Sequence, residues 1–344
     1  MVQENGNEKL LEVKDLVVSF FTYAGEVKAV RGISYTVRKG EVMGIVGESG
    51  SGKSVSSFGL LGMIPEPGKV LGGEILFDGQ NVIGMSEREL LKIRGKDISM
   101  IFQDPMTSLN PVFTVGDQID EVLRKHTNLS KEERRNRIIE LFSLVGINQP
   151  EKRISQFPYE FSGGMRQRVM IAMALSCNPT LLIADEPTTA LDVTIQAQIL
   201  ELMKELKQKI DMSIVFITHD LGVVSDICDH ICVMYAGVII EKGTSDQIFY
   251  NPKHPYTWGL LASVPKVNAD EHERLIPIEG NPVDLINPPV GCPFAPRCSR
   301  CMKACLTKMP PEATIEEGHT VACWLPVSEL MAEGEVSYGG SNEK

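Results

Sequence analysis

The sequence lacks the signs of several classes of protein. No run of about 18 uncharged apolar residues occurs, and the opening MVQENGNEKL has no apolar core of the kind found in secretory signals. Basic residues are outnumbered, since 34 Lys and Arg against 45 Asp and Glu leave a formal net charge of −11. We therefore expect a chain that neither spans a membrane nor is exported, and whose main task is not to coat nucleic acid, which requires a Lys and Arg excess.

Cysteine is scarce as well. The eight cysteines are too few for a disulfide scaffold, but five of them lie close together near the C-terminus: Cys292, Cys298, Cys301, Cys305 and Cys323. In a chain that is not exported, this clustering favours metal binding over disulfides.

What the sequence does contain is an alternation of apolar strand and helix patterns. Strands are expected at 11–20, 27–37, 41–46, 74–77, 98–102, 181–184, 214–218, 231–233 and 238–240, and helices from 54 to Pro65, at 115–125, 131–145 and 193–210. This order predicts a parallel sheet covered by helices. Beyond about residue 252 prolines become dense and the periodicity fades, which indicates a domain boundary there.

A glycine-rich loop follows the apolar strand 41–46. The run Gly47-Glu-Ser-Gly-Ser-Gly52-Lys53-Ser54 matches G-x-x-x-x-G-K-[ST] between a strand and a helix, where such a loop cradles phosphates. Its backbone N–H groups close around the phosphates, Lys53 supplies a cation and the Ser54 hydroxyl reaches Mg²⁺. The predicted nucleotide contacts are Gly47, Ser49, Gly50, Ser51, Gly52, Lys53, Ser54 and Val55.

A pair of carboxylates ends another apolar strand, in Leu181-Leu-Ile-Ala-Asp185-Glu186. Successive side chains of a strand point to opposite faces, so the two can have different roles. We expect Asp185 to hold Mg²⁺ and Glu186 to polarise the attacking water.

The segment Phe161-Ser162-Gly163-Gly164-Met165 precedes an apolar helix. Ser162 is a good N-cap, and the glycines leave N–H groups open to an anion. The segment resembles the signature motif of ABC-type ATPases, with Met165 in place of the usual glutamine. The resemblance implies that these residues bind the γ-phosphate held by a partner subunit.

Other motifs of that family appear in the expected order. Gln103 resembles the Q-loop glutamine, which contacts Mg²⁺ and water; Ala190-Leu191-Asp192 resembles the D-loop; and His219 resembles the switch histidine. The family also places an aromatic residue against adenine, and here Phe20 fits best, with Tyr23 second.

The sequence around these motifs is similar to that of the ATP-binding subunits of dipeptide and oligopeptide importers, from about Leu10 to Val327. The resemblance implies an ATPase that uses ATP and Mg²⁺ on the cytoplasmic face of a membrane. It also implies a second, non-identical ATPase subunit, two permeases and an external peptide-binding protein as partners. The alternatives are an importer of nickel or another small solute, and an ABC ATPase outside any transporter.

The C-terminal cysteines follow a pattern of the same family. The resemblance implies a four-iron, four-sulfur (4Fe-4S) cluster on Cys292, Cys298, Cys305 and Cys323, with Cys301 left over. Spacing alone leaves zinc and metal-free thiols open.

The fold implied is therefore α/β, an ABC nucleotide-binding domain with a mixed sheet core, an antiparallel β subdomain and a helical subdomain. We place a polar tail at 1–9, this domain at 10–255 with the helical part at about 110–176, a small Cys-containing domain at 256–330 and a tail at 331–344.

Overall fold

The computed structural model describes residues 8–189, 192–210, 212–264 and 277–327. Its twelve described strands form two sheets. The strands are β1 Lys9–Thr22, β2 Gly25–Arg38, β3 Val42–Val46, β4 Gly68–Phe77, β5 Gln80–Asn81, β6 Ile98–Ile101, β7 Leu181–Asp185, β8 Ser213–Thr218, β9 His230–Tyr235, β10 Val238–Thr244, β11 Ala313–Glu316 and β12 His319–Val321.

The main sheet has the strand order β11-β12-β10-β9-β3-β8-β7-β6. Within this order, the neighbours β9, β3, β8, β7 and β6 pair in parallel. The strands β11, β12 and β10 pair antiparallel with one another, and β10 is also antiparallel to β9. Every residue of β3, β7 and β8 is buried, which explains why these strands read as continuous apolar runs. The predicted mixed sheet is confirmed.

The second sheet, ordered β2-β1-β4-β5, is antiparallel. The strands expected at 11–20 and 27–37 are present as β1 and β2, which pair as a hairpin and whose alternating residues face a core shared with the main sheet. Leu16, Leu60 and Ile217 illustrate this core, because they come from the second sheet, from the helix after the glycine-rich loop and from the main sheet. The glycine-rich loop is thereby anchored between two sheets.

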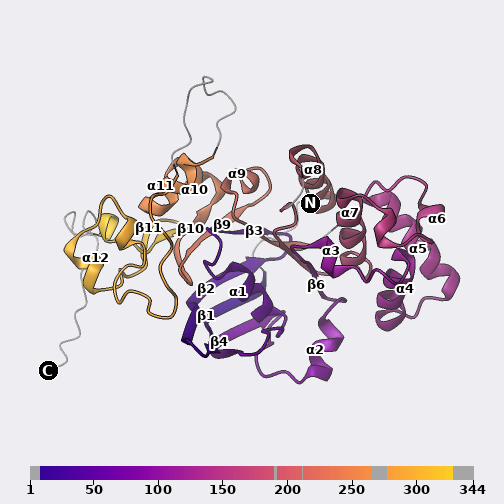
Figure 1. Ribbon diagram of the computed structural model, residues 1–344, viewed down its shortest axis with the longest axis horizontal. Helices are drawn as coiled ribbons and strands as arrows, with labels where there is room; N and C mark the ends of the chain where they lie inside the picture. The colour runs from indigo at the N-terminus through magenta and orange to yellow at the C-terminus, as the bar shows by residue number, and fades with distance from the viewer. Residues whose placement is uncertain (1–7, 190–191, 211, 265–276, 328–344) are drawn as a thin grey trace.

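Helices surround the sheets. They are α1 Lys53–Leu60, α2 Glu87–Ile93, α3 Pro105–Ser108, α4 Val115–His126, α5 Lys131–Leu144, α6 Pro150–Arg153, α7 Gly163–Ala174, α8 Val193–Lys209, α9 Leu221–Val224, α10 Ser245–Tyr250, α11 Pro255–Ala262 and α12 Lys303–Thr307. The helices expected at 115–125, 131–145 and 193–210 are confirmed, and Ser130 caps α5 as its sequence indicates. Helices α4–α7 gather at one end of the molecule and α12 lies at the other (Figure 1).

The C-terminal region adds two strands to the main sheet, which its sequence pattern did not predict. β12 pairs with β10 through Glu241↔Val321 and Lys242↔Thr320. The Glu241 side chain is buried and accepts hydrogen bonds from Lys253 N at 2.6 Å, His254 N at 3.0 Å and Thr257 Oγ1 at 2.6 Å. His319 Nε2 lies 2.9 Å from the same carboxylate. Since Cys292 and Cys305 join the same hydrophobic core as the main sheet, this region packs on the nucleotide-binding part.

The domain boundary predicted between residues 255 and 256 falls within the first turn of α11 and stays a prediction. Residues 1–7 of the predicted N-terminal tail lie outside the described residues. So do residues 328–330 of the predicted Cys-containing domain and all of the predicted tail at 331–344. No helix in the described part of the chain is long and apolar enough to cross a bilayer.

Candidate functional site

The glycine-rich loop has the conformation that its sequence predicts. It connects β3 to α1, and Gly50 and Gly52 adopt positive φ angles of 77° and 101°. At Gly52 an added Cβ would also collide with the carbonyl oxygen of Ala29, so this position requires glycine. The loop therefore curls tightly at the N-terminus of a helix, as a phosphate-binding cradle must.

Lys53 lies inside this cradle, with a side chain only 4% exposed. Its Nζ donates to Gly47 O at 2.7 Å and to Glu48 O at 2.9 Å. Burial lowers the pKa of Lys53, and the nearby Glu186 and Asp185 carboxylates oppose that shift. The ammonium group is thus held beside the loop, where phosphates would approach.

The Mg²⁺ ligands expected from the sequence are brought together. Ser54 Oγ donates to Asp185 Oδ1 at 2.9 Å, across 131 positions of sequence. Burial, reinforced by the Glu186 carboxylate, raises the pKa of Asp185 to about 6, and the Ser54 hydrogen bond opposes the shift. A hydroxyl and a carboxylate at the edge of a phosphate cradle fit a hard, oxygen-preferring cation.

Glu186 is the centre of the site. Its Oε2 accepts hydrogen bonds from Gln103 Nε2 at 3.0 Å and Thr189 Oγ1 at 2.8 Å and lies 3.3 Å from His219 Nδ1. Its Oε1 lies 4.0 Å from Lys53 Nζ. The three residues predicted to be catalytic, Glu186, His219 and Gln103, therefore meet at one carboxylate.

The backbone of Glu186 is in an uncommon conformation. Its φ angle is 46°, in the left-handed region that non-glycine residues rarely adopt, and its N–H donates to Ile217 O at 2.9 Å. A strained backbone conformation of this kind persists only where the surrounding structure holds it, and such conformations are concentrated at functional sites.

Thr189 was not identified from the sequence. Its only sequence signal was its place three residues after Glu186, a spacing at which the side chain can turn back to the carboxylate.

These residues line a cleft with a volume of about 810 Å³. The predicted residues in its wall are Ser49, Gly50, Gly52, Lys53, Ser54, Val55, Gln103, Glu186 and His219. The wall also contains residues of the C-terminal region, namely Pro277, Ile278 and Pro282, which the sequence did not indicate. The cleft is large enough for a drug-sized ligand.

The signature residues lie elsewhere on the chain. Ser162 caps α7 by accepting from Met165 N at 3.4 Å, and Asp192 caps α8 by accepting from Ile195 N at 2.9 Å. Ser162 and Gly163 are exposed, while Phe161 is buried. Neither Asp192 nor any residue of 161–165 is in the wall of the cleft, and Ala190 and Leu191 lie outside the described residues.

The predicted adenine contacts are not in the wall of the cleft either. The Phe20 ring packs against the hydrophobic core and over Gly68, and Tyr23 is fully exposed at the tip of the β1–β2 hairpin. The adenine assignment stays a prediction, without support from the described side chains.

The C-terminal cysteines lie near one another. Cys292 N donates to Cys305 O at 2.8 Å, and Cys292, Cys298 and Cys305 lie close enough to Cys323 to add to the rise that burial causes in its pKa. Burial raises the pKa of Cys292 to about 11 and that of Cys323 to about 12, so these thiols keep their protons at neutral pH. Within 8–189, 192–210, 212–264 and 277–327, no group of three or more His, Cys, Asp or Glu side chains is arranged to hold a metal ion. The expected 4Fe-4S cluster is therefore not supported by the structure.

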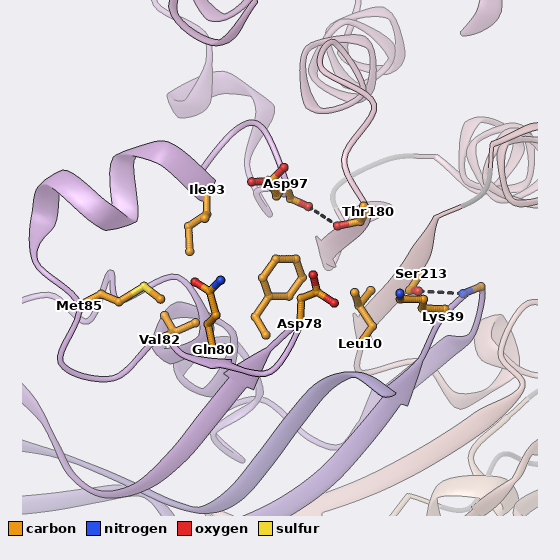
Figure 2. Close-up of a pocket in the computed structure, with 12 residues that line it drawn as sticks. Leu10, Lys39, Asp78, Gln80, Val82, Met85, Ile93, Asp97, Thr180 and Ser213 are labelled. Atoms are coloured by element: carbon orange, nitrogen blue, oxygen red, sulfur yellow. Dashed lines mark hydrogen bonds between the residues drawn. The ribbon is translucent and has the colours of Figure 1, made fainter. Parts of the chain in front are cut away.

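A second cavity, of about 440 Å³, lies beside the starts of β3, β7 and β8, where the side chains of Leu10, Lys39, Asp78, Asp97 and Thr180 surround it (Figure 2). It contains none of the motif residues. In parallel sheets ligands bind at the carboxyl ends of strands, which is where Asp185 and the glycine-rich loop lie.

Two protein-family models match the chain. The ABC transporter model matches residues 30–189, and the model described as the oligopeptide/dipeptide transporter C-terminal region matches residues 240–305. The second match covers Cys292, Cys298, Cys301 and Cys305.

Curated relatives match along nearly the whole chain. The oligopeptide transport ATP-binding protein OppD of Bacillus subtilis is 60% identical over 92% of this chain and 89% of that protein. The dipeptide transport ATP-binding protein DppD of Bacillus subtilis is 55% identical over 98% of this chain and 100% of that protein. OppD of Escherichia coli is 51% identical over 94% and 95%.

Solved structures share the fold. A dimeric ATP-binding cassette in a post-hydrolysis state, bound to ADP and phosphate, matches with a TM-score of 0.60 and 29% identity over 68% of this chain and 98% of that one. The cbiO1 protein of Clostridium perfringens, part of an ABC transporter complex, matches with a TM-score of 0.61 and 29% identity over 71% and 92%. The α/β cassette fold expected from the motifs is confirmed.

Proposed function

Because this chain belongs to the family of oligopeptide and dipeptide transport ATP-binding proteins within the ABC transporters, we propose that it hydrolyses ATP to drive peptide import. The observation that carries the proposal is the convergence of Lys53, Gln103 and His219 on the Glu186 carboxylate, beside the phosphate cradle. That arrangement places a base, a cation and two polar side chains around one point where a water can attack.

The chain's own residues divide the work of hydrolysis. Lys53 and the N–H groups of the loop bind and orient the phosphates. The Ser54 and Asp185 oxygens would hold Mg²⁺, which when bound neutralises charge on the phosphates. Glu186 accepts the proton of the attacking water, and Gln103 orients that water through the hydrogen bond that it shares with Glu186. His219, whose Nδ1 lies 3.3 Å from Glu186 Oε2, would contact the γ-phosphate.

The signature residues act on a different nucleotide. Since Ser162 and Gly163 are exposed and lie outside the wall of this chain's cleft, they are available to an ATP held by a second ATPase subunit. Two cassettes would close head to tail around two ATP molecules, with Asp192 at their interface. The dimeric cassette among the similar structures supports this assembly.

Transport itself requires other chains. We propose two permeases, a second and non-identical ATPase subunit and an external peptide-binding protein as partners, with this chain on the cytoplasmic face of the membrane. The family names of the relatives, oligopeptide and dipeptide transport ATP-binding proteins, support this assignment.

The 4Fe-4S cluster also belongs among the proposals. It rests on the resemblance of the cysteine pattern to that of the importer family, because no group of side chains in the described ranges is arranged to hold a metal ion. The buried thiols would have to lose their protons to bind the cluster. Visible absorption of anaerobically purified protein, with iron and sulfide analysis, tests it. A colourless sample without iron would contradict the cluster.

The function is tested in proteoliposomes that contain the complete importer. Oligopeptide presented with the binding protein should stimulate ATP hydrolysis, and labelled peptide should accumulate only when ATP is supplied on the side of this subunit. Stimulation by nickel and not by peptide would show a different solute, and hydrolysis unaffected by permeases would favour an ATPase outside any transporter.

A further inference from the structure

The second residue of the phosphate-binding loop, Glu48, is held from the C-terminal region by two contacts. Its carboxylate accepts two hydrogen bonds from Arg297, at 2.6 Å from Nη1 and 2.9 Å from Nη2. Its backbone N–H donates to Tyr256 Oη at 2.8 Å. Because Lys53 Nζ also donates to Glu48 O, the position of Glu48 affects the lysine that meets the phosphates.

Arg297 is itself fixed in place. Its side chain is 3% exposed, and its Nε and Nη2 donate to the carbonyl oxygens of Glu279 at 2.9 Å and Ile278 at 3.1 Å. The guanidinium lies over the rings of Tyr235 and Phe294, at 5.8 Å and 5.9 Å from their centroids. A planar fork with this many partners has a single available geometry, which lysine could not reproduce.

The chain that Arg297 holds is part of the nucleotide cleft. Ile278 lines the cleft, as do its neighbours Pro277 and Pro282. Further along, Leu285 O accepts from Lys28 N of β2 at 2.9 Å, so the described segment 277–286 is attached to the antiparallel sheet as well. One arginine therefore joins the loop at the floor of the cleft to the segment that forms its wall.

We propose that Arg297 is a positioning residue for nucleotide binding. It holds the phosphate-binding loop through Glu48 and the cleft wall through Ile278, so that the C-terminal region of this subunit completes the ATP site. This inference rests on the proposed function, and it adds a determinant of nucleotide affinity from outside the motifs. Arg297 touches no reacting atom, so its effect should appear in binding and not in chemistry.

The test uses the full-length chain and a fluorescent ATP analogue with Mg²⁺. Arg297→Ala should raise the Kd about tenfold, as expected for loss of a bidentate charge-assisted pair, and Glu48→Gln should raise it several-fold. The double variant should bind no more weakly than Arg297→Ala, because both changes break one interaction. Arg297→Lys should recover part of the affinity, and Arg300→Ala, an exposed arginine of the same segment, should bind like the wild type.

In the assembled importer, Arg297→Ala should raise the KM for ATP with kcat changed by less than about threefold. Arg297→Ala and Glu48→Gln variants whose Kd stays within about twofold of the wild type, or whose effects multiply in the double variant, would overturn the inference. If Arg297→Ala strongly lowers the melting temperature, the Kd of the Glu48→Gln variant alone decides whether the inference holds. Failure of the wild-type chain to bind the analogue would instead overturn the proposed function.

Discussion

Gln103 Nε2 donates a hydrogen bond to Glu186 Oε2 over 3.0 Å, although 83 positions of sequence separate the two residues. Gln103 follows β6, the last strand of the main sheet, and the helices α3–α7 lie towards that end of the sheet (Figure 1). A displacement of Gln103 would therefore reach the proposed catalytic base through a single hydrogen bond. We propose that the permeases dock near these helices, so that this hydrogen bond links their movement to hydrolysis.

Replacement of Glu186 by Gln should leave ATP binding intact and lower kcat at least a hundredfold, because the amide cannot accept the proton of the attacking water. Phosphate release measures kcat, and equilibrium binding of ATP with Mg²⁺ measures affinity. Glu205→Gln is the control, since Glu205 forms an exposed pair with Lys209 on α8, away from the cleft. Hydrolysis at the wild-type rate in Glu186→Gln would show that another group is the base.

Thr189→Val should lower kcat by about threefold to tenfold, with the KM for ATP little changed. The valine keeps the shape of the side chain but removes the 2.8 Å hydrogen bond that orients Glu186 Oε2. Thr189→Ser, which retains the hydroxyl, should stay close to the wild type. Equal losses in the valine and serine variants would show that the methyl group and not the hydroxyl matters.

The residues of the site were predictable where they belong to short motifs. Gly52, Lys53 and Ser54 lie within one loop, and Asp185 and Glu186 end one strand, so local spacing was enough. The pair Arg297–Glu48 joins positions 249 apart, and only the folded chain shows it.

The strands and helices of the fold were predictable where their apolar residues follow a regular pattern, and not elsewhere. Apolar periodicity identified β3, β7 and β8, but it missed β12, in which His319 is a buried polar residue whose partner, Glu241, lies on another strand. It also missed α11, which begins at a proline.

The free energy of unfolding should decrease as the pH falls from about 6.5 towards 4. Burial lowers the pKa of His254 to about 4, and its Nδ1 accepts the hydrogen bond from Tyr256 N that caps α11. In that range the unfolded chain takes up a proton that the folded chain does not, so up to about 3 kcal/mol is lost.

Urea titrations at several pH values measure this effect. His254→Asn retains an acceptor for the cap and should flatten the dependence between pH 6.5 and 4. An unchanged slope in this variant would assign the acid sensitivity to other groups.

Glu241→Ala should destabilise the folded chain by about 3 kcal/mol, since it leaves Lys253 N, His254 N and the Thr257 hydroxyl without their acceptor and removes the contact with His319. Urea unfolding measures the difference. Glu317→Ala, an exposed acid between β11 and β12, should change stability by less than about 0.5 kcal/mol. Comparable losses in both variants would argue against a special role for Glu241.

The pairing of β12 with β10 has a consequence for how this protein could be divided. A chain cut near residue 255 would keep every nucleotide motif, yet β10 would become the outermost strand, with a row of N–H and C=O groups open to other molecules. Strands exposed in this way recruit further strands and lead to self-association. The C-terminal region thus works as a cover for the sheet, and the cassette of this family member cannot be treated as a free-standing module.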